Sequence, residues 1–315
     1  MPQLGLAGRS SMTSEPRVLR VVGDDRSGTT VIGTVLGQLP ETTFVGELSQ
    51  VWRAFTTEGW QCSCGEPLAS CSFWVTVREK SGIDADDVDE LRTITEGLRV
   101  RPASLARLLG PSIGAAQAKY ATALARVYKA ISTAAKSTLI IDSSKSAPEL
   151  LLTARTLALD LSVLHVVRDP RAIAHSRSRR IPANKPGSQW MASEGPITSS
   201  IRWTTRNLLI ELACSRYAEK RNRMRYEDFV AEPSERIRAL ALGRETCGVV
   251  EQLREGRLTV GVRHALDGNT RVLRNVSTLE IRADDEWRSK MPPSRRLAAT
   301  MPAVPLLWMY RYGSI

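Results

Sequence analysis

The stretch Gly23–Thr30, GDDRSGTT, has residue types and spacing suited to holding an anion. Its two glycines and its final threonine fit the phosphate-binding pattern G-x-x-x-x-G-K-[ST], but Thr29 stands where that pattern has its lysine. The cation of the loop is instead Arg26, which lies before the second glycine. Glycines let backbone N–H groups approach an oxyanion, and a helix that follows adds partial positive charge. We therefore expect phosphate binding, without the lysine that nucleoside triphosphate enzymes use.

The elements predicted around this loop are those that a phosphate loop requires. Val18–Val22 is a short, β-branched run that predicts a buried strand. The apolar spacing of Val31–Leu36 predicts a helix, which Pro40 ends. Thr42–Val45 predicts the next strand, which leads into Glu47. The order is therefore strand, glycine-bearing loop, helix and strand.

The same alternation returns in the middle of the chain. Ser137–Ile141 and Leu161–Val167 are predicted strands, and each is followed by a polar cluster and a helix. The clusters are DSSK at 142–145 and RDPR at 168–171. Strands that alternate with helices predict a parallel sheet with helices on both faces, a three-layer α/β fold. Ligands of such sheets bind at the carboxyl ends of the strands, where all three polar clusters fall.

The chain has 315 residues, which suits one large α/β domain or two modest ones. We expect a single domain over 16–315 after a disordered tail at 1–15. Within it, about 75–136 is predicted to be a helical insertion. The Gly/Pro/Ser-rich stretch at about 185–200 is predicted to be a flexible loop.

Composition narrows the class of protein. The net charge of +11 favours anionic partners such as nucleotides, nucleic acids or acidic metabolites. No apolar run approaches the roughly 20 residues of a membrane span. The N-terminal residues lack the basic and apolar regions of a signal peptide, so a cytoplasmic protein is expected.

Three of the five cysteines, Cys62, Cys64 and Cys71, lie close together. They suggest part of a zinc site, but a closed structural site needs four ligands, and no further His or Cys lies nearby in the sequence. Free buried thiols, one disulfide or a bound metal therefore remain open, and no metal is expected.

The run RSGTT at 26–30 closely resembles the 5′-phosphosulfate loop of sulfotransferases, which transfer a sulfonate group from 3′-phosphoadenosine 5′-phosphosulfate (PAPS). RDPRAIAHS at 168–176 looks like the 3′-phosphate motif of that family, with an arginine at a strand end and a serine on the following helix. Five other segments look like elements of the bacterial branch: CSCGEPLASCSFW at 62–74, DSSK at 142–145, RYED at 225–228, HALDGN at 264–269 and YRYG at 310–313.

The resemblance implies a P-loop-like sulfotransferase that transfers sulfonate from PAPS to a hydroxyl and releases adenosine 3′,5′-bisphosphate (PAP). It implies that Arg26 neutralises charge on the bridging oxygen. The residues implied to hold the 5′-phosphate are Ser27, Gly28, Thr29 and Thr30. Arg168 and Ser176 would hold the 3′-phosphate; the other interpretation of Arg168 is a surface arginine paired with Asp169.

Glu47 is the expected base, because its position matches that of the glutamate base in tyrosylprotein sulfotransferases. Cytosolic aryl and steroid sulfotransferases use a histidine ahead of the 3′-phosphate motif, where this chain has DSSK. Asp142 is the alternative base. Lys145 is expected to be a second cation at the sulfonate, because it also follows a strand.

The segment after His264 is expected to cover the adenosine diphosphate end of the donor. His264, Gly268 and Asn269 would shape it, and Arg271 or Arg274 would contact the 3′-phosphate.

An aromatic ring should stack on adenine. Trp52, Trp74 and Trp203 are candidates for that ring or for core packing. Tyr226 contacts either the cofactor or the core.

Two other functions remain open. A P-loop phosphotransferase would require ATP and Mg²⁺, with Asp142 at the metal. A basic nucleic-acid-binding protein is disfavoured because aromatic content is 5%, the basic residues are dispersed and no recognition motif is present. A fold that binds the donor without reacting is a further alternative. The acceptor is expected to be a small-molecule hydroxyl on a metabolite, natural product, glycolipid or sugar, with no nucleic acid partner.

Overall fold

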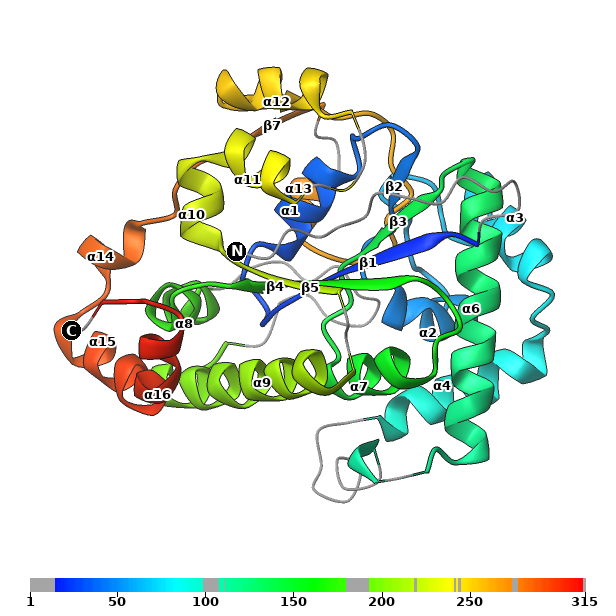
Figure 1. Cartoon of the computed structure of the whole chain (residues 1–315), viewed down its shortest axis with the longest axis horizontal. Coiled ribbons are helices and arrows are strands. Elements are labelled where there is room, and N and C mark those ends of the chain that lie inside the picture. Colours follow the sequence, from blue (N-terminus) through cyan, green and yellow to red (C-terminus); the bar gives the residue numbers. More distant parts are fainter. Residues whose placement is uncertain are drawn as a thin grey trace.

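A five-stranded sheet lies at the centre of the fold, and its neighbouring strands all run parallel (Figure 1). The computed structural model describes residues 15–98, 108–110, 112–179, 193–217, 220–240, 242, 245–273 and 277–313. The sheet has the order β2-β3-β1-β4-β5. Its strands are β1 (Arg17–Val22), β2 (Thr42–Phe44), β3 (Leu139–Asp142), β4 (Leu161–Val167) and β5 (Lys220–Arg225). The carboxyl ends of the five strands therefore meet at one edge of the sheet.

Helices cover both faces of this sheet. The alternating side chains of β1 show why: Val18 and Val22 join one apolar core, whereas Leu19 and Val21 join another on the opposite face. In Figure 1, α1 and α10–α12 lie on one side of the sheet, and α7 and α9 on the other. The three-layer α/β architecture predicted from the sequence is confirmed.

The helices are α1 (Thr29–Leu36), α2 (Val51–Thr56), α3 (Ser72–Ser81), α4 (Ala85–Gly97), α6 (Ala115–Ala135), α7 (Ala147–Thr156), α8 (Pro170–Ser178), α9 (Pro196–Tyr217), α10 (Tyr226–Ala231), α11 (Pro233–Ala239), α12 (Cys247–Arg254), α13 (Thr270–Leu273), α14 (Glu286–Lys290), α15 (Pro293–Thr300) and α16 (Val304–Met309). A two-stranded antiparallel ribbon joins β6 (Arg257–Thr259) to β7 (Thr278–Glu280). Short 3₁₀ turns follow Glu47 and Thr300.

The predicted loop over about 185–200 is wrong at its C-terminal end. Residues 180–192 lie outside the described ranges, but α9 already begins at Pro196. Proline suits the first turn of a helix, where its missing N–H has no intrahelical acceptor, so a Pro-rich stretch also fits a helix start. Of the predicted tail at 1–15, residues 1–14 lie outside the described residues, and the single domain stays a prediction. Helices α3, α4 and α6 occupy most of the predicted helical insertion.

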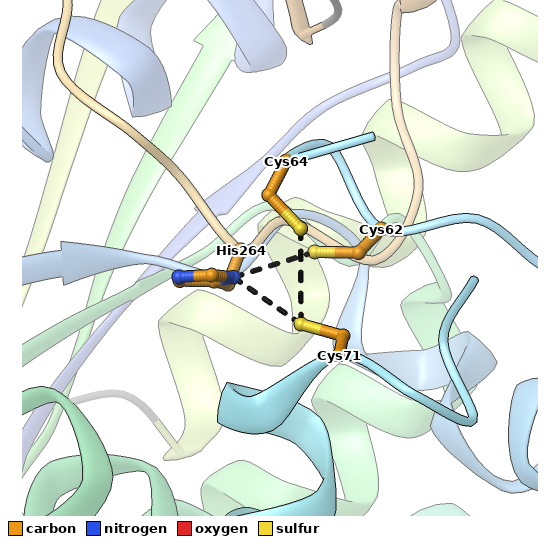
Figure 2. Close-up of side chains that lie close together, drawn as sticks. All are labelled: Cys62, Cys64, Cys71 and His264. Carbon is orange, nitrogen blue, oxygen red and sulfur yellow. Dashed lines mark hydrogen bonds between the residues drawn. The ribbon is translucent and has the colours of Figure 1, made fainter. Parts of the chain in front are cut away.

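The cysteine-bearing loop between α2 and α3 is fastened to a distant part of the chain. The Ser63 N–H donates to the carbonyl of Ala265 at 3.1 Å, and the Ser63 hydroxyl donates to the carbonyl of Arg263 at 2.8 Å. The Ala265 N–H returns a bond to the Ser63 hydroxyl at 2.8 Å. This pairing brings His264 beside the three clustered cysteines (Figure 2).

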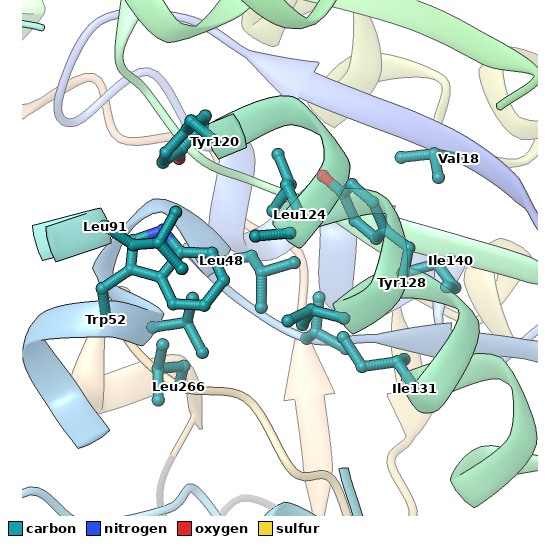
Figure 3. Close-up of a cluster of buried hydrophobic side chains, with 14 of the residues drawn as sticks. Val18, Leu48, Trp52, Leu91, Tyr120, Leu124, Tyr128, Ile131, Ile140 and Leu266 are labelled. Carbon is teal, nitrogen blue, oxygen red and sulfur yellow. The ribbon is translucent and has the colours of Figure 1, made fainter. Parts of the chain in front are cut away.

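The larger apolar core packs against α6 (Figure 3). It includes residues from the segment after β2 and from the cysteine-bearing loop. Trp52 and Tyr120 meet edge to face, with ring centroids 6.1 Å apart. Leu48 and Leu266, both fully buried, reach the same core. The segment after β2 and the segment that contains Leu266 are therefore anchored in the same apolar core.

A buried ionic cluster lies under the sheet, on the face covered by α6 and α7. Arg20 on β1 contacts Glu149 at 3.1 Å and Asp142 at 3.4 Å, and all three side chains are inaccessible to water. The hydroxyl of Tyr128 donates to Asp142 at 2.6 Å. Burial raises the pKa of Glu149 from its ordinary value of 4.5 to about 7, although Arg20 opposes the shift.

This cluster predicts a free energy of unfolding that falls as pH rises from about 4.5 to about 7. Between about pH 4.5 and 7 the folded protein keeps the Glu149 proton that the unfolded chain has lost, so the free energy of unfolding declines with rising pH. The expected contribution is about 3 kcal/mol, at about 1.36 kcal/mol for each unit of pKa. Urea unfolding of wild type and Glu149→Gln at pH 5 and pH 8 checks it, since glutamine mimics the protonated acid. Parallel pH dependences in the two proteins would contradict the prediction.

Among the residues that the structure describes, no helix has both the length and the apolar character needed to span a membrane.

Candidate functional site

The phosphate loop connects β1 to α1, as the sequence predicts. Its backbone enters the left-handed region at Arg26 (φ 73°) and Gly28 (φ 93°), and α1 begins at Thr29. The first N–H groups of a helix have no intrahelical acceptors, so the loop and this helix start together have the geometry that an anion site requires. Thr29 and Thr30 are buried at that start.

Tyr226, the first residue of α10, closes one side of the loop. A Cβ atom on Gly28 would lie 2.2 Å from a carbon of the Tyr226 ring, so only glycine permits this approach. The pKa of Tyr226 is raised by burial. Tyr226 therefore lies at the predicted cofactor loop and is also partly buried against the core.

Two arginines that the sequence analysis missed hold the acidic residues of the loop. Arg177 on α8 contacts Asp24 at 2.8 Å, and Arg206 on α9 contacts Asp24 at 2.9 Å and Asp25 at 2.6 Å. Burial raises the pKa of Asp24 despite these partners. Burial opposes ionisation of Asp25 as well, but Arg206, Lys145 and Arg177 hold its pKa well below the usual range. The two carboxylates thus fix the loop in place.

Arg168, at the end of β4, reaches the loop directly. Its Nη1 donates to the carbonyl of Arg26 at 2.9 Å, and its guanidinium lies over the Tyr226 ring, 4.8 Å from the centroid. Its Nη2 contacts a carboxylate oxygen of Asp284 at 3.0 Å. The two motifs that sequence reasoning assigned to separate phosphates therefore touch each other.

The alternative interpretation of Arg168, as a surface arginine paired with Asp169, is wrong. Arg168 is only 7% exposed. Asp169 instead accepts from the N–H of Arg171 at 2.8 Å as the N-cap of α8, and its carboxylate pairs with the Arg171 guanidinium at 2.7 Å. The cap leaves Arg168 to point toward the loop rather than toward Asp169.

Gly268 and Asn269 also lie against the loop. The N–H of Asn269 donates to the Thr30 hydroxyl at 3.3 Å, and a Cβ on Gly268 would lie 3.2 Å from the same oxygen. The side chain of Arg271 and the whole of Arg274 lie outside the described residues. Ser176 is buried on α8.

The imidazole of His264 faces the clustered cysteines, and its expected part in shaping the segment over the donor stays a prediction. Its Nδ1 faces Cys62 and Cys71, at 3.6 and 3.4 Å from their sulfurs. His264 is also a fourth side chain with a potential metal-ligand atom at the three cysteines, and the sequence analysis could not find it because nearly 200 residues separate it from them.

Glu47 and Lys145 form an ion pair at the carboxyl ends of β2 and β3. The N–H of Glu47 donates to the carbonyl of Asp267 at 3.2 Å, which links the pair to the segment over Thr30. Burial would lower the pKa of Lys145, but the carboxylates of Glu47 and Asp25 raise it. Lys145 is therefore a charged group next to both the loop and the predicted base.

Asp142, the alternative base, is unsuited to that role. It is fully buried and accepts hydrogen bonds from the Tyr128 hydroxyl, the Ser144 N–H and the Leu48 N–H. These bonds join β3 to the segment after β2, so Asp142 positions the backbone next to Glu47. Engaged in this way, it is also a poor ligand for the Mg²⁺ of a phosphotransferase.

The tryptophans considered for adenine stacking are all core residues. Trp52, Trp74 and Trp203 are each at most 1% exposed. The Trp203 indole N–H donates to the carbonyl of Arg168 at 3.0 Å, so this ring orients the strand end that carries Arg168.

Comparison with known proteins supports the fold. No protein-family model and no curated protein sequence matches the chain. Among solved structures, the chain is similar to the sulfotransferase domain from the curacin biosynthetic pathway, with a TM-score of 0.52, 19% identity, and 93% of this chain and 98% of that chain covered. It is also similar to the sulfotransferase domain from the Synechococcus PCC 7002 olefin synthase, with a TM-score of 0.50, 17% identity and coverages of 98% and 99%. The resemblance to sulfotransferases is thus confirmed at the level of the fold.

Proposed function

We propose that this protein is a sulfotransferase that transfers a sulfonate group from PAPS to a hydroxyl of a small-molecule acceptor and releases PAP. The observation that carries the proposal is the contact between Arg168 and the carbonyl of Arg26. It joins the loop at 23–30, which lacks the usual lysine, to Arg168, a buried cation at the end of the neighbouring strand β4. A donor with a 5′-phosphosulfate and a separate ribose 3′-phosphate requires two such anion sites.

In the proposed complex, the 5′-phosphate binds the backbone N–H groups of Ser27–Thr30 at the start of α1. The 3′-phosphate binds Arg168, with Ser176 and either Arg271 or Arg274 as further candidates. Tyr226, Gly268 and Asn269 line the donor, which agrees with their contacts to the loop.

The proposed reaction is an in-line transfer. The acceptor oxygen forms a bond to sulfur, its proton passes to the carboxylate of Glu47, and the bond from sulfur to the bridging oxygen breaks. The electron pair of that bond leaves with the 5′-phosphate of PAP. Arg26 and Lys145 neutralise the charge that develops on the departing oxygen and the sulfonate. The position of Lys145 beside Glu47 and Asp25 supports this role.

Calorimetry with PAP, 5′-AMP and Mg-ATP tests the proposal. We expect PAP to bind and 5′-AMP to bind at least about tenfold more weakly, because a charge-assisted hydrogen bond to the 3′-phosphate is lost. Preference for Mg-ATP would instead indicate a phosphotransferase, and binding of none of the three would refute a PAPS-dependent enzyme.

We expect the carboxylate of Asp284 to compete with the 3′-phosphate of the donor for Arg168. Its carboxylate already contacts Arg168 at 3.0 Å, and its side chain is 34% exposed. Replacing it in Asp284→Ala should tighten PAP binding by roughly two- to fivefold, the value of a partly exposed ion pair. Calorimetry should show no such gain for 5′-AMP. Weaker PAP binding by the variant would mean that Asp284 orients Arg168 rather than competing for it.

A further inference from the structure

Four side chains with metal-binding atoms converge on one point outside the donor site (Figure 2). Cys62 and Cys64 come from the loop after α2, Cys71 lies immediately before α3, and His264 comes from the segment before α13. The three sulfurs and one imidazole nitrogen all lie within 4.8 Å of one another.

Three of the distances between these atoms match those of a tetrahedral metal centre. Cys64 Sγ and Cys71 Sγ are 3.8 Å apart, and His264 Nδ1 lies 3.6 Å from Cys62 Sγ and 3.4 Å from Cys71 Sγ. A zinc ion about 2.3 Å from sulfur and about 2.0 Å from nitrogen separates its ligand atoms by about 3.5–3.8 Å. A disulfide would bring two sulfurs to about 2.0 Å, and all three cysteines are free.

The surroundings suit a closed site with thiolate ligands. Cys62 and Cys71 are buried, so little water reaches their sulfurs. The backbone N–H groups of Cys64 and Trp74 hydrogen-bond the sulfurs of Cys62 and Cys71, which favours the thiolate form. A divalent cation would supply the remaining charge that such buried thiolates need.

The imidazole ring of His264 is held in place by a neighbouring aromatic ring. Phe73 stacks on the His264 ring, with centroids 4.8 Å apart and planes 9° from parallel, so the imidazole is held with Nδ1 toward the sulfurs. A metal-bound imidazole coordinates through one ring nitrogen, and here the nitrogen that faces the sulfurs is Nδ1.

We propose that Cys62, Cys64, Cys71 and His264 bind one zinc ion in a closed Cys₃His site. The three thiols release their protons when the ion binds, and His264 coordinates through Nδ1. With four protein ligands the metal has no position for a substrate, so its role is structural.

The proposed metal would position part of the donor site. It would tie the cysteine loop to the segment that begins at residue 263. The end of that segment reaches the candidate site, where the Asp267 carbonyl accepts from the Glu47 N–H and the Asn269 N–H donates to the Thr30 hydroxyl. Gly46, at φ 73°, lets this segment cross closely, because a Cβ there would lie 2.5 Å from the Asp267 carbonyl oxygen. The zinc proposal itself does not depend on the proposed sulfonate transfer.

Elemental analysis of tag-free protein purified in reductant tests the site. We expect about one zinc per chain in wild type and in Cys247→Ser, an exposed cysteine that serves as the matched control. Cys64→Ser and His264→Ala should lose most of the metal, whereas His264→Cys should retain it as a Cys₄ site. Equal zinc in wild type and His264→Ala would overturn the proposal.

A second measurement needs no variant that alters folding. Wild-type protein reconstituted with Co²⁺ alone should show the intense visible absorption of tetrahedral thiolate-bound cobalt, together with thiolate-to-metal charge transfer. A weak spectrum typical of octahedral cobalt would overturn the assignment, as would a Cys64–Cys71 disulfide detected by mass spectrometry in the protein as isolated from cells.

Discussion

Glu47→Gln is expected to lower kcat for sulfonate transfer by about 10²- to 10⁴-fold, the usual value of a general base. Glutamine keeps the shape of the side chain but cannot take the acceptor proton. PAP affinity should stay within a few-fold of wild type, because Glu47 is proposed to act on the acceptor and not on the donor. The measurement is steady-state turnover of PAPS with a hydroxyl acceptor found by screening, next to calorimetry with PAP.

The control for this prediction is Glu58→Gln, which changes an exposed glutamate outside the site and should leave turnover unchanged. Glu47→Gln also removes an ion-pair partner from Lys145, whose side chain is only 11% exposed, so thermal unfolding of each variant has to be compared. If Glu47→Gln turns over at the wild-type rate while remaining folded, Glu47 is not the base.

Local patterns were sufficient to predict the elements that carry the site. The buried strand β1, the glycine-bearing loop and helix α1 follow one another in sequence, so hydrophobic periodicity and the positions of glycine identify them. The N-cap Asp169 and the proline after it likewise identified the start of α8. Since parallel strands share one carboxyl edge, the sequence also indicated that Arg26, Glu47, Lys145 and Arg168 would lie at that edge.

Pairings between distant residues could not be predicted in this way. Arg177 and Arg206 lie far along the chain from Asp24, and nothing in their own neighbourhoods marks them as its partners. The acidic pair itself was the available signal, because two carboxylates in an anion-binding loop require cations. His264 was missed as a partner of the cysteines for the same reason, since only the folded backbone at Ser63 and Ala265 brings it there.

Arg168→Ala is expected to weaken PAP binding by about 10- to 100-fold, whereas the affinity for 5′-AMP should fall by no more than a few-fold. The difference isolates the interaction of the guanidinium with the 3′-phosphate, because 5′-AMP lacks that group. Both affinities are expected to fall somewhat, since Arg168 also supports the loop through the Arg26 carbonyl and the Tyr226 ring.

The matched control is Arg171→Ala, which removes a neighbouring arginine that pairs with Asp169 and makes no described contact with the loop. It should leave the ratio of the two affinities at its wild-type value. An equal loss of PAP and 5′-AMP binding in Arg168→Ala would mean that Arg168 acts only by shaping the phosphate loop. The 3′-phosphate would then have to bind elsewhere, and the contact between the two motifs would no longer support PAPS as the donor.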